Sequence, residues 1–146
     1  MKPLETFFFL DSVYTVIVYF LNRTTMKSSY IDAFILVIPK DKVEKYKKMA
    51  DDGCNMWMKH GALSYRECMG NDLAPKMEGM EVLPFPQLVN LKDDETVWFS
   101  YIEYASKEHR DEVNKKVMEA WDEKAKENPN FMDEYDGVFD MKRFST

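Results

Sequence analysis

The chain has 146 residues and a net charge of −6, with 45% hydrophobic and 32% charged residues. This length fits one folded domain, and the composition is that of a globular protein rather than a disordered one. The negative charge argues against nucleic acid or an anionic membrane as the main partner, because both require a positively charged surface. These properties exclude several classes of protein without indicating a reaction.

The chain begins with a strongly apolar segment. Residues 7–21 read FFFLDSVYTVIVYFL, which is shorter than the roughly 20 apolar residues of a membrane-spanning helix and is interrupted by an acid. The segment also lacks the cationic start and the cleavage site of a signal peptide, and its aromatic and β-branched residues favour a strand. We divide the chain into an apolar extension (1–28) and a domain (29–146). A disordered or membrane-contacting extension is the alternative, as is a natural start at Met26.

A strand and a helix are predicted next. Residues 30–38 (YIDAFILVI) alternate so that Asp32 and Phe34 share one face of a strand. Pro39 ends this strand, and a helix is expected over residues 41–60, with Gly61 as its stop signal. Its inner face carries residues spaced by three and four, namely Val43, Tyr46, Ala50, Gly53 and Trp57.

The middle of the chain predicts two further strands around a long loop. Residues 62–69 read as a strand, and residues 73–87 contain three Pro and read as an irregular loop. We expect a third strand segment formed by residues 88–91 and 96–104, with a hairpin turn between them.

The last third of the chain predicts one more helix. Ser106 is a good N-cap, and the helix is expected to continue to about Glu127 and to bury Val113, Val117 and Trp121. After it, only residues 138–144 resemble the start of a strand.

This order predicts an α+β fold of the ferredoxin-like, split βαβ type, with two helices on one face of the sheet. The strands are apolar on both faces, so two helices cannot cover all of their hydrophobic residues. We therefore expect a homodimer in which a second copy covers the other face. The residues expected on that face are Ile35, Val37, Val97, Phe99 and Tyr101.

Several short motifs between residues 29 and 143 resemble a known family. They are Ile38-Pro39-Lys40-Asp41-Lys42, His60-Gly61-Ala62-Leu63 with Tyr65, Glu67, Cys68, Gly70 and Asp72, then Phe85-Pro86, Glu95-Thr96-Val97, Phe99-Ser100, Ser106 with His109-Arg110-Asp111 and Asn114, and Phe139-Asp140-Met141-Lys142-Arg143. In this order they resemble the YbaA-like family of unknown function. The resemblance implies a dimeric α/β barrel. The wider superfamily includes cofactor-independent monooxygenases, haem-degrading enzymes and stress-related proteins, so the fold decides no function. Some members carry a label linking them to signal recognition particle RNA, which the acidic charge does not support.

The chain departs from the family pattern at both ends. Family members usually continue past the Lys142-Arg143 motif into a full fourth strand, whereas here the sequence reads only Phe144-Ser145-Thr146. We hypothesise that residues 7–21 form a hairpin with the first strand and occupy the edge that the truncated fourth strand leaves.

Two histidines are candidate catalytic residues, because only histidine titrates near neutral pH without perturbation. His60 lies at a helix C-terminus, where a structural role with the helix dipole is the competing explanation. His109 lies in the first turn of the second helix, beside Arg110 and Asp111. It is predicted either in a polar cluster at a cavity mouth or at a solvated helix start.

Two carboxylates on apolar strand faces are the other candidates. Glu67 shares a face with Tyr65 and Met69, and Asp32 shares one with Phe34. Such a carboxylate is expected either to be paired with one of the arginines Arg66, Arg110 and Arg143, or to have a raised pKa and act as acid or base.

The two cysteines, Cys54 and Cys68, lack the spacing of a disulfide framework or a zinc site. Two free thiols favour a reducing, cytoplasmic compartment. We expect both side chains to pack as small apolar groups, and the alternative is that Cys68 acts as a nucleophile. The sequence also lacks a phosphate-binding glycine loop and a Ser-His-Asp arrangement, so we expect neither a cofactor nor a metal.

Two functions remain open. The first is a dimeric small-molecule-binding or stress-associated protein, whose apolar cavity holds a small apolar or aromatic ligand. The second is a cofactor-independent monooxygenase or isomerase, with Glu67 or a histidine as the acid–base group. In either case Tyr65 and Trp98 are expected to shape the pocket, with Arg110 and Asp32 as further ligand-binding candidates.

Overall fold

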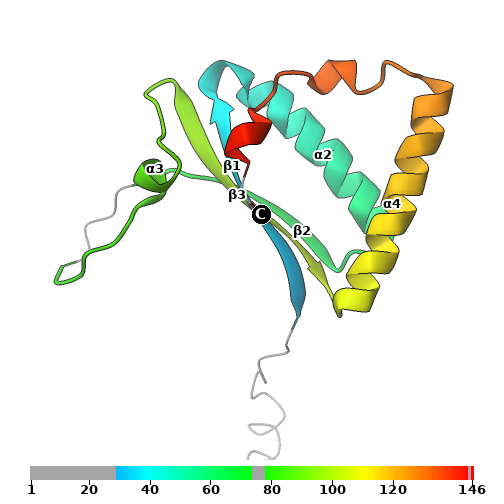
Figure 1. Cartoon of the computed structure of the whole chain (residues 1–146), viewed down its shortest axis with the longest axis horizontal. Helices are drawn as coiled ribbons and strands as arrows, with labels where there is room; N and C mark the ends of the chain where they lie inside the picture. Colours follow the sequence, from blue (N-terminus) through cyan, green and yellow to red (C-terminus); the bar gives the residue numbers. More distant parts are fainter. Residues whose placement is uncertain (1–28, 74–77, 145) are drawn as a thin grey trace, which may run out of the picture.

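The computed structural model describes residues 29–73, 78–144 and 146, so the predictions for residues 1–28 lie outside the described residues. Two long helices and a sheet make up most of the described chain (Figure 1). The strands are β1 (Tyr30–Pro39), β2 (Ser64–Met69) and β3 (Glu95–Tyr104), and the long helices are α2 (Val43–Lys59) and α4 (Lys107–Glu127). The short helices are η1 (Lys40–Lys42), α3 (Phe85–Leu88), η2 (Asp133–Tyr135) and η3 (Met141–Arg143).

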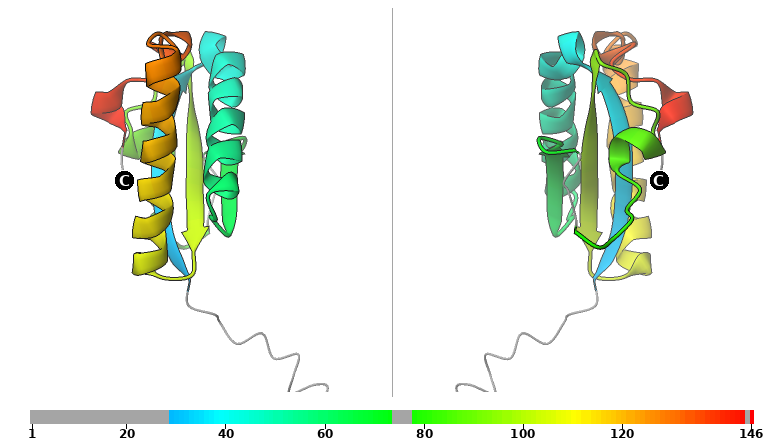
Figure 2. Two further views of the ribbon diagram at one scale, coloured as in Figure 1. Left: turned by 90° about the vertical axis from the view of Figure 1, so that its right-hand side faces the viewer. Right: turned by 90° about the vertical axis from the view of Figure 1, so that its left-hand side faces the viewer.

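The described strands form an antiparallel sheet in the order β1-β3-β2. The long helices lie side by side against one face of this sheet (Figures 1 and 2). This arrangement confirms the predicted α+β class and is consistent with the ferredoxin-like fold.

Apolar residues on the helix-facing side of the strands pack against the inner faces of the two helices. One cluster centres on Tyr46 and Trp98, whose rings meet edge to face at 4.9 Å. A second cluster lies at the other end of the sheet, where Val113 and Val117 of α4 are fully buried. Both clusters follow from the predicted helical spacing of three and four residues.

The helix boundaries confirm two predicted signals. Ser106 caps α4, because its hydroxyl accepts a hydrogen bond of 3.2 Å from the backbone N–H of His109. Gly61 follows α2 with a φ of 111°, a left-handed conformation that favours glycine.

The predicted strand at residues 88–91 is wrong. Residues 85–88 form the helical turn α3, in which Pro86 lies in the first turn with its φ already fixed for a helix. The backbone N–H of Leu91 then bonds the carbonyl of Pro86, and Asn90 takes a positive φ of 49°. The chain therefore enters β3 from a turn, and the predicted hairpin does not form.

The predicted strand start at residues 138–144 is also wrong. Asp140 accepts a hydrogen bond from the backbone N–H of Lys142 and thereby starts the short helix η3. The segment returns to the β1 side of the sheet, where the ring of Phe144 stacks on Phe34 at 5.4 Å. In the described residues, this segment packs its aromatic rings over the helix-facing side of β1 and forms no fourth strand.

The sheet face opposite the long helices is covered at one end and open at the other. Val37 and Val97 are almost fully buried there, and the side chain of Leu73 fills the space that a Cβ at Gly70 would need. At the other end Ile31 is 49% exposed. The prediction that this face is apolar is therefore confirmed, although part of it is covered by the chain itself.

Candidate functional site

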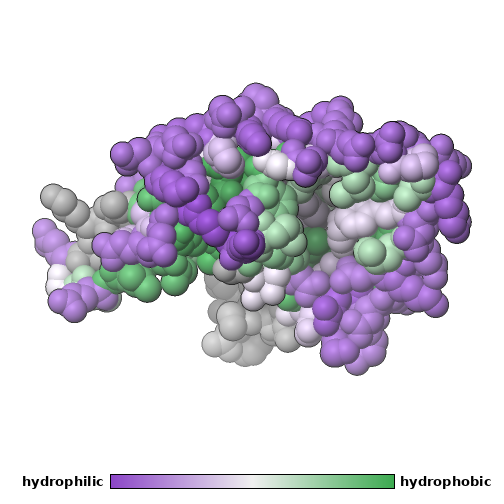
Figure 3. Space-filling view, turned by 45° about the horizontal axis from the view of Figure 1, so that its top comes forward, coloured by the Kyte–Doolittle hydropathy of each residue, from purple (hydrophilic) through white to green (hydrophobic). Residues whose placement is uncertain are grey.

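An apolar cavity of about 270 Å³ lies between the helix-facing side of the sheet, α2, α4 and the segment after α4. In the space-filling view, hydrophobic and neutral side chains lie in a hollow between the hydrophilic outer surfaces of the helices (Figure 3). The lining residues are Phe34, Leu36, Tyr46, Met49, Ala50, Asp52, Gly53, Trp57, Tyr65, Glu67, Ser100, Ile102, Trp121, Lys124, Phe131, Met132, Tyr135, Phe139 and Phe144.

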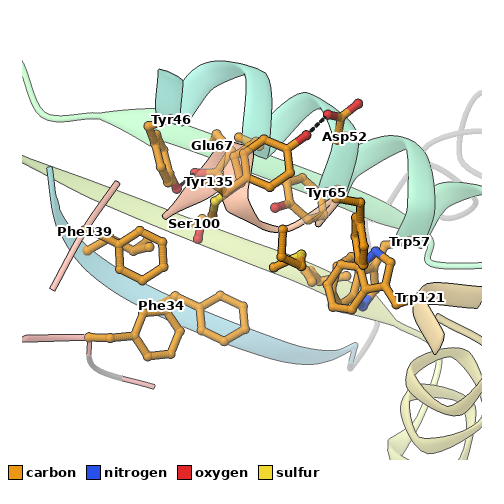
Figure 4. Close-up of a pocket in the computed structure, with 18 of the residues that line it drawn as sticks. Phe34, Tyr46, Asp52, Trp57, Tyr65, Glu67, Ser100, Trp121, Tyr135 and Phe139 are labelled. Atoms are coloured by element: carbon orange, nitrogen blue, oxygen red, sulfur yellow. Dashed lines mark hydrogen bonds between the residues drawn. The ribbon is translucent and has the colours of Figure 1, made fainter. Parts of the chain in front are cut away.

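Aromatic rings from β1, α2, β2, α4 and the segment after α4 form the cavity walls. Trp57 of α2 and Trp121 of α4 meet edge to face at 5.0 Å. Figure 4 shows these two rings at one end of the cavity and Phe34 with Phe139 at the other. The cavity is therefore suited to a flat or bulky apolar group.

The segment after α4 closes one side of the cavity. Its aromatic residues face inward, while its polar groups bond to residues of α2. Tyr135 donates to the carboxylate of Asp52 (dashed in Figure 4), Lys48 pairs with Glu134, and the ammonium of Lys45 donates to the carbonyl of Asp136 at 2.9 Å. These contacts attach the segment after α4, which we call the closing segment, to α2 at the solvent-exposed surface.

Glu67 provides the polar group on the sheet side of the cavity. It lies on β2 directly opposite Ser100 of β3, and its Oε2 accepts a hydrogen bond of 2.7 Å from the hydroxyl of Tyr46. Burial raises the pKa of Glu67, against the effect of hydrogen bonding to Tyr46 and Tyr65. Burial and this carboxylate likewise raise the pKa of both tyrosines, so their hydroxyls remain protonated donors at neutral pH.

Glu67 has no cationic partner in the described part of the chain. Its partners are hydroxyl groups, and no ion pair includes it. Lys124 is the single cationic residue among the described residues that line the cavity, and it is exposed.

A smaller cavity of about 200 Å³ also borders Glu67 and lies between α2 and the sheet. Its lining includes Cys54 and Trp98. Trp98 packs beneath Tyr46 and does not line the main cavity, and its indole N–H has no partner among the described residues. The structure thus places Trp98 at the wall of the smaller cavity and outside the lining of the main one.

Asp32 and Arg110 lie in a separate polar cluster outside the main cavity. Arg110 approaches the carboxylate of Asp32 at 3.5 Å and donates to the hydroxyl of Tyr30 at 3.1 Å. Asn114 donates to Asp32 at 3.4 Å and accepts from the indole N–H of Trp57 at 2.9 Å. The cluster joins β1 to α4 and matches the structural ion pair that was one of the two predictions for Asp32.

The two histidines lie at the turn between α2 and β2, away from the main cavity. His109 accepts a hydrogen bond of 3.1 Å from the backbone N–H of Ala105, and its ring meets Tyr104 edge to face. His60 is the C-cap of α2. Neither is among the described residues that line the cavity. Of the acid–base candidates, only Glu67 is brought together with Tyr65 at the site.

Cys68 is exposed at the free edge of β2, and Cys54 is half-buried in α2. The two cysteines do not share a site, because only Cys54 lines the smaller cavity beside Glu67.

Within residues 29–73, 78–144 and 146, no group of three metal-ligating side chains is present. Over the same residues, neither long helix carries an apolar stretch that could cross a bilayer.

The sequence patterns did not identify all of the residues that form the site. Tyr46, Trp57 and Trp121 were predicted on inner helix faces, yet nothing in the sequence separated cavity-lining positions from core positions. Phe139 and Tyr135 contact the cavity only because the segment after α4 returns to α2. No local pattern signals such a return.

These features define a small α+β protein with an antiparallel sheet and an apolar, aromatic-lined cavity, in which Glu67 has hydroxyl partners and no cationic partner among the described residues. Residues 29–137 match the family described as "Protein of unknown function (DUF1428)", and the chain belongs to this family.

The chain is also similar to curated relatives. It is 38% identical over 89 residues to "Uncharacterized protein YbaA" of Escherichia coli (strain K12), a match that covers 61% of this chain and 73% of that protein. The protein of the same name from Shigella flexneri matches with the same identity and coverage. These matches confirm the resemblance predicted from the motifs, and they state no activity.

Proposed function

We propose that this protein binds a small, largely apolar aromatic molecule in the cavity beside Glu67. The single observation that carries the proposal is the cavity itself, which is walled by aromatic rings and has Glu67 and Ser100 on its sheet side. A well-packed core of this size would leave few voids larger than a water molecule. An aromatic-lined space with a small number of polar groups is the usual form of a small-ligand site.

Tryptophan fluorescence tests this proposal directly, because Trp57 and Trp121 line the cavity. Titration with 2-phenylethanol, an uncharged aromatic probe, should change the emission of the full-length protein in a saturable way. Native mass spectrometry of freshly purified protein should show a small co-purifying ligand or a one-to-one complex with the added probe.

A cavity-narrowing variant supplies the control. Ala50→Leu adds apolar atoms at a cavity-lining position of α2 and should weaken the response at least several-fold. Ala125→Leu adds the same atoms to α4 at a position outside the lining and should leave the response unchanged. Thermal melting by circular dichroism checks that both variants fold. Unchanged emission at millimolar probe, with no bound ligand in the mass spectra, would overturn the proposal.

We also propose that two copies pack through the open sheet face and form the dimeric α/β barrel of the ferredoxin-like superfamily. Ile31 is 49% exposed on this face, and Phe99 and Tyr101 are only half-buried. Light scattering after size exclusion should give a dimer. Ile31→Glu should dissociate it, whereas Met118→Glu, at an exposed position of α4, should not. A monomeric wild-type protein would contradict this proposal.

The apolar extension completes the proposed architecture. In the described residues β1 pairs only with β3, so its other edge is free to accept a further strand. We propose that residues 7–21 supply this strand. Deletion of residues 1–25 should lower the unfolding midpoint or cause aggregation, and a soluble, equally stable dimer would refute the idea.

The two free thiols are consistent with a reducing, cytoplasmic compartment.

A further inference from the structure

Glu67 differs from Asp32 and Glu95, two other half-buried carboxylates, in having no cation beside it among the described residues. Glu103, outside the cavity lining, also lacks an ion pair and accepts a hydrogen bond from the hydroxyl of Ser64. Asp32 pairs with Arg110, and Glu95 pairs with Arg143. Lys47 lines the smaller cavity near Glu67, yet its ammonium lies 2.7 Å from the carboxylate of Glu44. A carboxylate removed from water is normally accompanied by a positive charge. Glu67 therefore lacks a partner that the two other carboxylates have.

The surroundings of Glu67 favour a positive charge supplied by a ligand. Aromatic rings carry negative charge on their faces and attract cations. Trp57, Trp121, Tyr65 and Phe139 line the same cavity as Glu67. Asp52, which is exposed and accepts a hydrogen bond from Tyr135, adds a second carboxylate to the lining. A cation in the cavity would meet aromatic faces and carboxylates, with Lys124 at the exposed margin as the one opposing charge among the described lining residues.

The same groups disfavour an anionic ligand. A carboxylate or phosphate placed beside Glu67 would face its charge at close range, and Lys124 at the exposed margin is the one cation in the described lining. The chain as a whole carries a net charge of −6, which attracts cations and repels anions at long range. Local and overall charge therefore select the same sign of ligand.

From these observations, and resting on the proposed function, we infer that the ligand is an arylalkyl amine bound as its ammonium ion. Its N–H groups would donate to the Oε atoms of Glu67 and to the hydroxyl of Ser100, which lies directly across the strand pair. Its aromatic body would lie among the rings of the cavity wall. No bond is made or broken, so the inference concerns recognition alone.

The test uses three probes of similar size, of which one is a cation, one is uncharged and one is an anion at pH 7. They are 2-phenylethylamine, 2-phenylethanol and phenylacetate, titrated against the full-length protein by tryptophan fluorescence or calorimetry. The wild-type protein should bind the amine about tenfold more tightly than the alcohol. This factor corresponds to about 1.4 kcal/mol, at the lower end of what a hydrogen bond to a charged group contributes. Phenylacetate should bind least.

Glu67→Gln keeps the shape of the side chain and removes its charge, so the preference for amine over alcohol should fall to near parity. Glu123→Gln makes the same change in net charge at an exposed position of α4 outside the cavity lining and should keep the preference. A preference that survives in Glu67→Gln would overturn the role of Glu67. The comparison of the three probes on the wild-type protein does not depend on either variant folding.

The possible failures are distinguishable. If the alcohol binds as well as or better than the amine, the inference of an amine ligand is wrong and the proposed small-molecule function stands. If none of the probes binds and no ligand co-purifies, the proposed function itself fails, and the amine inference with it.

Discussion

Two carboxylates on the same face of the sheet have different environments, although the alternation of the sequence predicts the same environment for both. Asp32 on β1 and Glu67 on β2 flank the central strand β3 and face the helices. Asp32 is bound by Arg110 and Asn114 of α4. Glu67 is bound by the hydroxyl of Tyr46 and faces two cavities.

The difference lies in what the neighbouring helix offers. α4 presents a guanidinium and an amide to β1, so that end of the sheet closes around a satisfied ion pair. α2 presents a tyrosine and the small residues Ala50 and Gly53 near β2, so that side stays hollow. The strand pattern alone shows that a carboxylate is shielded. The residues of the facing helix decide whether the carboxylate forms a structural ion pair or remains available to a ligand.

Asp32→Asn is expected to have the largest effect on stability. It removes the charge that pairs with Arg110, whose side chain is only 25% exposed, and should lower the free energy of unfolding by about 1–2 kcal/mol. Urea denaturation at fixed protein concentration measures this loss. A double-mutant cycle with Arg110→Met should give a coupling energy of similar size, and additive effects of the two changes would show that the pair is not a stabilising one.

Glu67→Gln should have a smaller effect of the opposite sign at neutral pH. Burial raises the pKa of Glu67 in the folded protein above its ordinary value of 4.5, so folding favours the protonated form. The stabilisation that this provides is complete below pH 4.5 and is lost as the pH rises through the folded-state pKa. Glutamine carries no such penalty.

The unfolding midpoint of Glu67→Gln should therefore lie above that of the wild type at pH 7, and the two should converge near pH 4. Unfolding curves at several pH values check this. A variant that is less stable than the wild type at pH 7 would place Glu67 with Asp32 as a structural carboxylate and would remove the contrast between them.

Gly53→Ala should change stability least. A Cβ at this position would lie 3.1 Å from the hydroxyl of Tyr65, so the ring must move by a few tenths of an ångström. The better helix propensity of alanine, about 1 kcal/mol, offsets that contact and leaves the free energy of unfolding within about 0.5 kcal/mol.

Probe binding should respond more clearly than stability, because Tyr65 lines the cavity beside Glu67. Gly53→Ala should weaken binding of 2-phenylethylamine in a fluorescence titration. Asn55→Ala, at an exposed position of the same helix, should not. Equal affinities in the two variants would mean that the Tyr65 hydroxyl has no part in shaping the site.

Local sequence signals predicted most of the fold. The strands β1, β2 and β3, the cap at Ser106 and the turn at Gly61 follow from alternation, capping and glycine, all of which act over a few residues. The strand predicted over residues 88–91 failed because the prolines on either side of Phe85 favour a helical turn, which outweighs the apolar character of the segment.

The site was predicted only in part, for a related reason. Glu67 and Tyr65 were found because they share one face of a strand, a relation visible within three residues. Whether Arg110 pairs with Asp32 or with another carboxylate depends on contacts between segments distant in sequence. The same holds for the rings of the closing segment, which reach the cavity by such contacts.

The segment after α4 also has a kinetic consequence. The hydrogen bonds that fasten it to η1 and α2 join residues separated by 83 to 95 positions in the chain, from Tyr135–Asp52 to Lys42–Gly137. Closing so long a loop carries an entropic cost, and these bonds lie at the solvent-exposed surface. The closing segment is therefore expected to dock last in folding and to detach first. The sheet and the long helices would then form first, and the cavity would stay open on one side until the closing segment docks.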